Sequence, residues 1–155
     1  MNTNRKAFLD MIAFSELGQG LIDISDNGYN VIVGSTAQHP DLFSSYADHP
    51  RKLVRLNAKL SSTAAGRYQL LARYFDAYKK QLGLNDFAYA SQDAIALQQV
   101  KECHALADID AGRFTSAVTK CAHIWASLPS AGYGQHENSI ALLQKAYINA
   151  GGTLV

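Results

Sequence analysis

Hydrophobic residues recur at helical spacing along most of the chain. Residues 5–16 predict a first helix, in which Phe8, Ile12 and Glu16 share one face because they lie four residues apart. Four further apolar stripes predict the helices of the main body. They are Leu70 to Leu82, stopped by Gly83; a helix capped by Ser91 that carries Ile95, Leu97, Val100 and Cys103; Phe114 to Trp125, ended by Pro129; and Ile140 to Tyr147, closed by Gly151 and Gly152.

The pattern changes between residues 23 and 58, where short strand-like stretches replace the helical stripes. The sequence Asp26-Asn27-Gly28 is typical of a turn, and strands are expected at 29–33, 42–46 and 52–56. The order of elements predicts an α+β fold, with a mostly helical body and a small β-sheet or hairpin lobe inserted after the first helix. A cleft between two such lobes would accommodate an extended ligand.

The length of 155 residues predicts one domain over residues 1–155. A net charge of +1 gives no electrostatic basis for binding nucleic acid or for stable membrane association. The apolar run from Met11 to Phe14 is too short for a signal peptide or a membrane helix, so we expect no export signal. Cys103 and Cys121 are expected to be free buried thiols, and no histidine or cysteine spacing suits zinc, so no metal or cofactor is predicted.

Glu16 stands where the first predicted helix runs into a polar loop at Leu17-Gly18. Partial burial and the negative end of the helix dipole would both disfavour its charged form. A carboxylic acid that stays protonated near neutral pH can donate a proton to a glycosidic oxygen. The alternative is an ordinary helix-terminal glutamate in solvent.

Seven stretches of the sequence follow one another in the order known from a single protein family. They are RKAFLDM (5–11), YNVIVG (29–34), DHPRKLV (48–54), AGRYQLL (65–71), KQLGL (80–84), IWASLP (124–129) and AGYGQ (131–135). Together they make the chain resemble the lambda-type phage endolysins, or lambda lysozymes, which are peptidoglycan-cleaving lytic transglycosylases. The resemblance implies a two-lobed lysozyme-like fold with the catalytic glutamate at Glu16. The segment between Glu16 and Tyr29 and the loop at 35–43 depart from the family pattern.

The same resemblance implies a partner and a location. The expected ligands are the glycan strands of peptidoglycan, bound by a monomer that lacks a separate cell-wall-binding domain. The protein would remain in the host bacterial cytoplasm until a separate holin releases it to the periplasm and cell wall.

The mechanism depends on whether a second carboxylate takes part. Hydrolytic glycosidases usually need two, and Glu102 and Glu137 are expected to be structural, the latter at the start of the last helix. Asp23 and Asp26 are the acidic residues nearest to Glu16 in the following loop, so a hydrolytic muramidase would activate water through one of them. A transglycosylase needs only Glu16, because the C6 hydroxyl of the substrate attacks C1. A non-catalytic glycan-binding module is the third possibility.

Two glycine-containing segments are expected to position the glycan. Gly66 would permit close backbone approach, and Gln69 offers a donor and an acceptor to an N-acetyl or hydroxyl group. An aromatic side chain between Gly132 and Gly134 suits stacking on a sugar ring. The predicted substrate-binding residues are Arg67, Tyr68, Gln69, Tyr133 and Gln135. The alternatives are a helix-start turn with surface polar groups for the first segment, and a tyrosine that plugs its own loop for the second.

Overall fold

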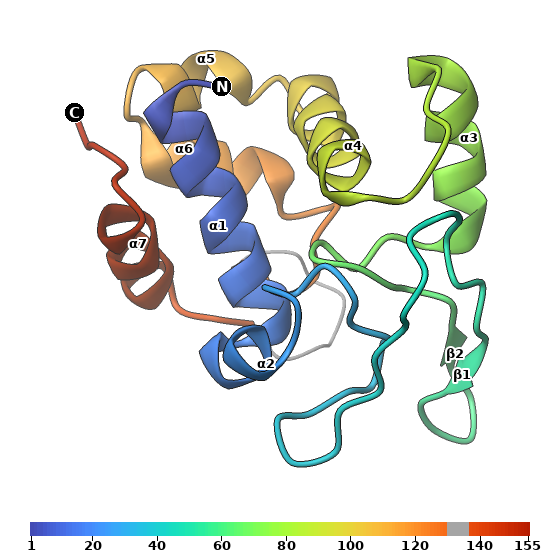
Figure 1. The fold of residues 1–155 in the computed structure, drawn as a ribbon. Helices are drawn as coiled ribbons and strands as arrows, with labels where there is room; N and C mark the ends of the chain where they lie inside the picture. Colours follow the sequence, from blue (N-terminus) through green and yellow to red (C-terminus); the bar gives the residue numbers. More distant parts are fainter. Residues whose placement is uncertain (130–136) are drawn as a thin grey trace. The chain divides into compact units, whose positions relative to one another are not determined.

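The structure is a computed structural model that describes residues 1–129 and 137–155 (Figure 1). Its elements are α1 (Thr3–Leu17), α2 (Gln19–Ile24), β1 (Val54–Arg55), β2 (Ser61–Ser62), α3 (Ala72–Leu82), α4 (Tyr89–Glu102), α5 (Leu106–Asp110), α6 (Phe114–Cys121) and α7 (Ile140–Asn149). The helices and the two-stranded antiparallel sheet confirm the predicted α+β class. The chain forms two compact units, one made of Met1–Glu16 and Ala96–Val155 and the other of Leu17–Ile95.

Helix α1 is the central element of the first unit. Its Phe8 packs edge-on against Phe114 of α6, with ring centroids 6.3 Å apart, and Phe114 in turn contacts the ring of Tyr147 in α7 at 4.9 Å. The side-chain amide of Asn4 donates to the carbonyl of Ile109 in α5 at 3.0 Å. These contacts fix the helix that carries Glu16 at its C-terminal end.

A buried carboxylate joins α5 to α6 in the same unit. Asp108 accepts hydrogen bonds from Lys120 Nζ at 2.5 Å, Arg113 Nε at 2.7 Å and Ser116 Oγ at 2.9 Å. The hydrogen bond from Lys120, followed by those from Arg113 and Ser116, holds the pKa of Asp108 well below its usual range. These hydrogen bonds explain why Asp108 is buried, and they give it a structural role in joining α5 to α6.

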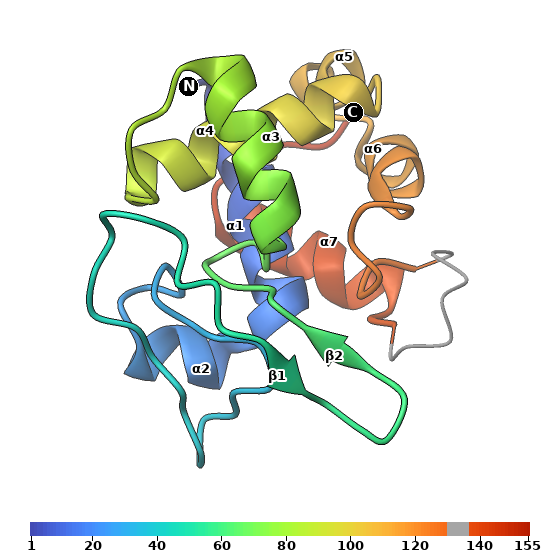
Figure 2. The same ribbon diagram turned by 90° about the vertical axis from the view of Figure 1, so that its right-hand side faces the viewer.

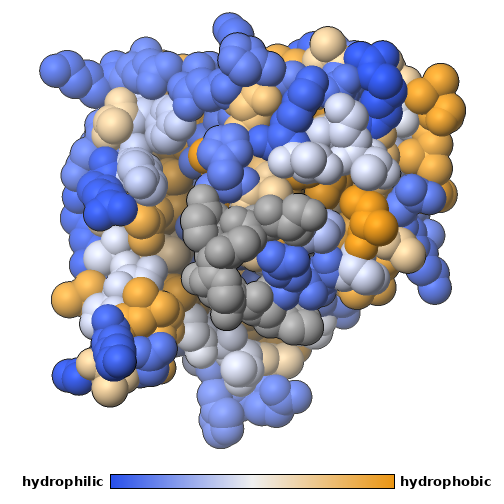
Figure 3. Space-filling view, turned by 180° about the vertical axis from the view of Figure 1, so that it is seen from behind, coloured by the Kyte–Doolittle hydropathy of each residue, from blue (hydrophilic) through white to orange (hydrophobic). Residues whose placement is uncertain are grey.

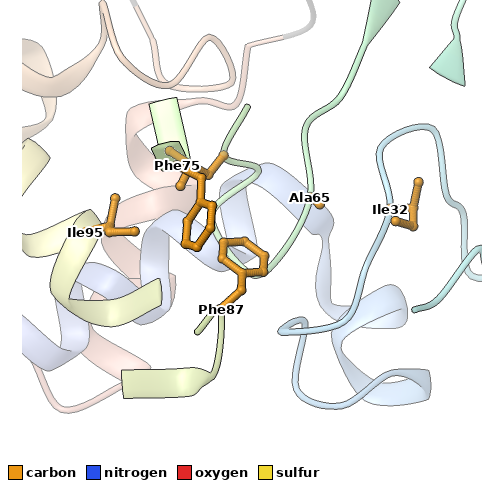
Figure 4. Close-up of a cluster of buried hydrophobic side chains, with 6 residues drawn as sticks. Ile32, Ala65, Phe75, Phe87 and Ile95 are labelled. Carbon is orange, nitrogen blue, oxygen red and sulfur yellow. The ribbon is translucent and has the colours of Figure 1, made fainter. Parts of the chain in front are cut away.

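The second unit has its own hydrophobic core (Figure 4). The core comprises Ile32, Ala65, Leu70, Phe75, Phe87 and Ile95. Phe75 of α3 and Phe87 meet edge to face, with ring centroids 5.0 Å apart. The buried ring of His49 lies 4.8 Å from that of Phe87, and its Nε2 lies 2.7 Å from the carbonyl oxygen of Leu70. The loop that carries His49 is thereby attached to the aromatic core.

The β-structure is smaller than predicted and partly displaced (Figure 2). Of the expected strands, 52–56 contains β1, which pairs with β2 at 61–62, beyond the predicted lobe limit of residue 58. The stretches 29–33 and 42–46 contribute only isolated bridges, Val31 with Leu42 and Ile32 with Ala65.

The reason lies in the turns that precede the expected strand at 29–33. The amides of Tyr29 and Val31 donate back to Asp26 and Gly28 in turn hydrogen bonds, so neither is available to a strand partner. Val31 and the next residue, Ile32, are both buried, whereas a half-buried strand would alternate.

The predicted end of α3 is confirmed, whereas the predicted N-cap of α4 is not. Gly83 ends α3 in the left-handed conformation, with a φ of 65°, as predicted. The prediction that Ser91 caps α4 is wrong, because α4 begins at Tyr89 and the Ser91 hydroxyl donates to Asp86 at 2.6 Å. Asp86 also accepts from the amide of Ala88 at 3.1 Å, which forms a turn just before the helix begins.

The last two helices are shorter than the sequence predicts. Helix α6 ends at Cys121, and Trp125 is buried in the turns that follow. Helix α7 begins at Ile140 with Ser139 as its N-cap, so Glu137 precedes the helix and does not open it. Gly151 follows α7 with a φ of 97°, which agrees with the predicted glycine stop.

Cys103 and Cys121 are buried and free, as predicted. On the face shown in Figure 3, hydrophobic and hydrophilic side chains are interspersed. The exposed large hydrophobic residues include Leu53 beside β1 and Leu142 and Ile148 of α7. Within the described ranges, every helix is too short or too polar to traverse a lipid bilayer.

Candidate active site

Glu16 is the next-to-last residue of α1, at the end of its buried face. Phe8 and Ile12, which precede it at four-residue intervals, are both fully packed in the interior. The side chain of Glu16 is partly exposed, yet the protein around its carboxyl removes enough water to raise the pKa to about 8. Partial exposure and strong desolvation are compatible, because a group can meet solvent on one side and be enclosed on the others.

The raised pKa has a direct chemical consequence. A glutamate with an ordinary pKa of 4.5 is almost fully ionised at pH 7, whereas one with a pKa of about 8 is mostly protonated. Such a group can donate a proton at neutral pH and can take one back as a moderately strong base. The expectation that burial keeps this carboxyl protonated agrees with the structure.

The two candidate second carboxylates are already engaged in local structure. Asp23 is exposed on α2 and accepts a hydrogen bond from Gln19 Nε2 at 2.7 Å. Asp26 Oδ2 accepts from the hydroxyl of Tyr46 at 2.6 Å and from that of Tyr89. The hydrogen bonds from Tyr46 and Tyr89 lower the pKa of Asp26, which makes it a weaker base.

Asp26 belongs to an aromatic cluster that ties the turn at 26–28 to α4. Tyr29 stacks on Tyr89 with ring centroids 4.3 Å apart, and the Tyr29 hydroxyl donates to Asp93 at 2.9 Å. The Tyr68 hydroxyl donates to the same oxygen of Asp93 at 2.7 Å. Hydrogen bonds within this cluster therefore explain the positions of Asp26 and Asp93.

The glycine at position 66 approaches another part of the protein closely. Gly66 has a φ of 83°, and a side chain there would collide with Oε1 of Gln92. That oxygen accepts from the amide of Arg67 at 2.9 Å, while Gln92 Nε2 donates to the carbonyls of Tyr29 at 3.0 Å and Phe87 at 2.8 Å. The sequence predicted that another group comes close to the backbone at Gly66, and in the structure that group is the side chain of Gln92.

The predicted substrate-binding residues fall into three groups. Arg67 and Tyr68 are buried, and the guanidinium of Arg67 lies over the rings of Tyr29 and Tyr68 at 5.2 and 5.8 Å, so both support the turn from inside. Gln69 is partly exposed and adopts a left-handed φ of 52°. Tyr133 and Gln135 lie outside the described residues.

The side-chain amide of Gln69 is held by the backbone through its nitrogen. Its Nε2 donates to the carbonyls of Gly66 at 2.9 Å and Val31 at 3.4 Å, which orients the amide. No hydrogen bond to its Oε1 is observed from the part of the chain that the structure describes. A non-glycine residue in this conformation costs free energy, and such residues cluster at functional sites. Gln69 therefore remains the predicted contact of this segment best placed to accept a hydrogen bond.

Three supporting residues were missed by the sequence interpretation. Gln92 and Asp93 were passed over because a helix with polar residues beside Ser91 looks like an ordinary solvent-facing helix start. Asn138, whose side-chain amide donates to the carbonyl of Ser15 at 3.0 Å, was also missed, although it is polar and precedes the Ser139 cap of α7. The only available signal for Gln92 was its seven-residue spacing from Gln99, which places both on one helix face, and both are buried.

Among residues 1–129 and 137–155, no group of three potential metal-ligating side chains comes together. The arrangement described above requires none, because proton transfer by a carboxyl group needs no metal ion.

Comparisons with known proteins agree on one family. The sequence model of the Endolysin family matches residues 6–154. The chain is 56% identical over 155 residues to the endolysin of Escherichia phage lambda, with 99% of this chain and 95% of that protein covered. It is 45% identical over 154 residues to the endolysin of Escherichia phage P2, with 96% of this chain and 93% of that protein covered.

Solved structures give the same result at the level of fold. The bacteriophage lambda lysozyme complexed with a chitohexasaccharide matches with a TM-score of 0.93 and 55% identity, covering 100% of this chain and 98% of that one. A second structure of the lysozyme from bacteriophage lambda matches with a TM-score of 0.89 and 54% identity over the same shares of the two chains. The predicted lysozyme-like fold and the resemblance based on seven short stretches are confirmed. The chain belongs to the endolysin family and is of the lambda lysozyme type.

Proposed function

We propose that this lambda-type endolysin cleaves the β-1,4 bond between N-acetylmuramic acid and N-acetylglucosamine in peptidoglycan by lytic transglycosylation, with Glu16 as general acid and base. The observation that carries the proposal is the carboxyl of Glu16, which desolvation keeps protonated up to a pH of about 8. The chitohexasaccharide in the lambda lysozyme structure supports a β-1,4-linked aminosugar chain as the ligand class.

The reaction balances without water. The proton of the Glu16 carboxyl passes to the glycosidic oxygen as the bond from that oxygen to C1 breaks. The C6 hydroxyl of the same N-acetylmuramic acid attacks C1, and its proton goes to the Glu16 carboxylate. Because the attack is intramolecular, proximity can supply on the order of 7–11 kcal/mol of the barrier. The product is a 1,6-anhydro end, and Glu16 regains its starting state.

The environments of Asp23 and Asp26 support a one-carboxylate mechanism. A general base for water needs an accessible oxygen of suitable basicity. Two tyrosine hydroxyls occupy Oδ2 of Asp26 and lower its pKa, and Asp23 is an exposed residue paired with Gln19. Hydrolysis through either aspartate remains the alternative reaction, and its products differ.

Mass spectrometry of muropeptides separates the two reactions. Purified peptidoglycan is digested with the wild-type protein, with Glu16→Gln as the blank and with Asp23→Ala and Asp26→Ala as comparisons. Transglycosylation gives products one water lighter than hydrolytic ones, and these resist borohydride reduction. Reducible ends, lost in either aspartate variant, would establish hydrolysis instead. Binding to sacculi without any cleavage would leave only a glycan-binding module.

Substrate contacts are proposed at Gln69, through its Oε1, and at Tyr133 and Gln135 from their sequence context. Gln69→Ala is expected to raise KM more than it lowers kcat, because the residue would hold the glycan and take no part in proton transfer. A lower kcat with an unchanged KM in Gln69→Ala would assign Gln69 a different role.

We also propose that the protein reaches the wall from the host cytoplasm through a separate holin and acts as a monomer. Expression in a host without a holin is expected to leave the cells intact until their inner membrane is permeabilised. Prompt lysis in the absence of a holin would contradict this route.

A further inference from the structure

Ser15 immediately precedes Glu16, and its carbonyl oxygen lies in the last turn of α1. Figure 1 labels this helix. The last four carbonyls of a helix lack partners within the helix. Gly18 follows with a φ of 78° and a ψ of 153°, which interrupts the backbone between α1 and α2. The carbonyl of Ser15 therefore needs a donor from elsewhere, since Ser15 is only 7% exposed.

That donor is the side-chain amide of Asn138. Its Nδ2 lies 3.0 Å from the carbonyl oxygen of Ser15 and 3.1 Å from the Ser15 hydroxyl oxygen. The orientation of the amide follows from chemistry, because a carbonyl oxygen only accepts and must therefore face the nitrogen of Asn138. The two protons of one amide group can thus both be used on the residue that precedes Glu16.

Asn138 is itself held through its backbone. Its backbone N–H donates to the carbonyl of Ser127 at 2.9 Å, and the hydroxyl oxygen of Ser127 lies 2.9 Å from the hydroxyl oxygen of Ser15. Ser15, Ser127 and Asn138 therefore form a closed set of hydrogen bonds, which we call the Ser15 clamp. Every member belongs to the same compact unit as Glu16.

We propose that Asn138 is a positioning residue for the reaction, because the Ser15 clamp fixes the last turn of α1 and so the direction in which Glu16 presents its carboxyl group. This inference rests on the proposed role of Glu16. Asn138 touches no reacting atom in this scheme and acts only through the backbone of Ser15. Small displacements of an acid from its productive position are costly, since about 1 Å can lower the rate roughly 100-fold.

The decisive variant is Asn138→Asp, which keeps the size of the side chain and removes both amide donors. Its carboxylate would repel the carbonyl of Ser15 and place a negative charge near Glu16. We expect kcat to fall by roughly ten- to hundredfold at pH 7 with little change in KM. Towards acid pH the introduced carboxyl gains a proton and with it one donor, so the activity of this variant relative to wild type should rise. Asn138→Ala should lose kcat without this acid recovery.

Two controls separate positioning from general stability. Asn149→Asp makes the same chemical change at an exposed residue of α7 and should leave kcat within about twofold of wild type. Ser15→Ala removes the hydroxyl but keeps the carbonyl that Asn138 binds, so it should lose less activity than Asn138→Asp. All rates are taken at a temperature where circular dichroism shows each variant to be folded.

The outcomes are distinguishable from failure of the proposed function. Wild-type kcat in folded Asn138→Asp and Asn138→Ala, with Glu16→Gln inactive, would overturn the positioning role and leave the role of Glu16 intact. A Ser15→Ala loss as large as that of Asn138→Asp would also overturn it, because the carbonyl contact would then not be the important one. Retained activity in Glu16→Gln would instead remove the proposed function.

Discussion

Replacing Glu16 by glutamine is expected to stabilise the protein at neutral pH while abolishing its activity. The folded state raises the pKa of this carboxyl from 4.5 to about 8. Between those values the unfolded chain releases the proton and the folded protein keeps it, so stability falls as pH rises. At pH 7 the interval above 4.5 is 2.5 pH units, which at about 1.36 kcal/mol per unit corresponds to about 3 kcal/mol. Glutamine carries no such proton and avoids this loss.

The stability difference between Glu16→Gln and the wild type should increase as pH rises. Below pH 4.5 both states hold the proton, so the wild type and Glu16→Gln should have nearly equal free energies of unfolding. The advantage of the variant should grow with pH and level off above a pH of about 8. Urea denaturation at pH 4.5, 7 and 8.5 measures it directly, and in thermal melts about 3 kcal/mol corresponds to roughly 10 °C for a chain of this size.

The matched control is Glu102→Gln, the same substitution at an exposed position at the end of α4. Its effect on the free energy of unfolding should stay within about 0.5 kcal/mol. A Glu16→Gln variant that is less stable than wild type at pH 7, or whose advantage does not change with pH, would refute the conclusion that desolvation keeps the Glu16 carboxyl protonated in the folded protein.

Three further predictions follow from the same structure. The kcat of the wild type should fall as pH rises through about 8, where Glu16 loses the proton it must donate, and a pH–rate profile measures this alkaline limb. Burial lowers the pKa of His49, whose Nδ1 accepts from the amide of residue 51 at 2.9 Å. The stability that His49 contributes should therefore be present above pH 6.5 and lost as pH falls through its folded pKa. Thermal melts of Glu16→Gln over this pH range measure the loss, because this variant lacks the opposing effect of Glu16. Gly66→Ala should cost about 3 kcal/mol in urea denaturation, because it combines a strained φ with a collision against Gln92, whereas Gly83→Ala, with open space around it, should cost only about 1 kcal/mol.

The helical part of the fold was predictable because its signals are local. The spacing of Phe8 and Ile12 identifies the buried face of α1, and Gly83 and Gly151 stop their helices through a backbone conformation that glycine adopts readily. The β-structure was less predictable, because β1 pairs with residues 61–62, and that pairing depends on contacts the local pattern does not contain.

The candidate site divides in the same way. Glu16 could be identified from its place at the end of an apolar helix face. Burial and the helix dipole were the expected causes of a raised pKa, and desolvation is the cause found in the structure. The partners of Asp26 could not be identified, since Tyr46 and Tyr89 lie 20 and 63 residues away in the sequence. Hydrogen bonds over such separations leave no periodic trace, so a turn residue and a water-activating residue look alike until the fold is known.

The contrast between Ser15 and Glu16 explains how one turn of helix serves both folding and catalysis. The carbonyl of Ser15 is buried and receives a donor from Asn138, whereas the carboxyl of Glu16 is desolvated and kept from ionising. A donor aimed at Glu16 itself would favour the charged form and lower its pKa, which would weaken it as an acid at neutral pH. Rigidity therefore has to come from the neighbouring backbone. The positioning of the acid and the tuning of its pKa are therefore separable. Asn138→Ala should lower kcat while leaving the alkaline limb of the pH–rate profile near pH 8 in place. A variant that moves this limb without reducing the maximal kcat should be found among the residues that surround the carboxyl.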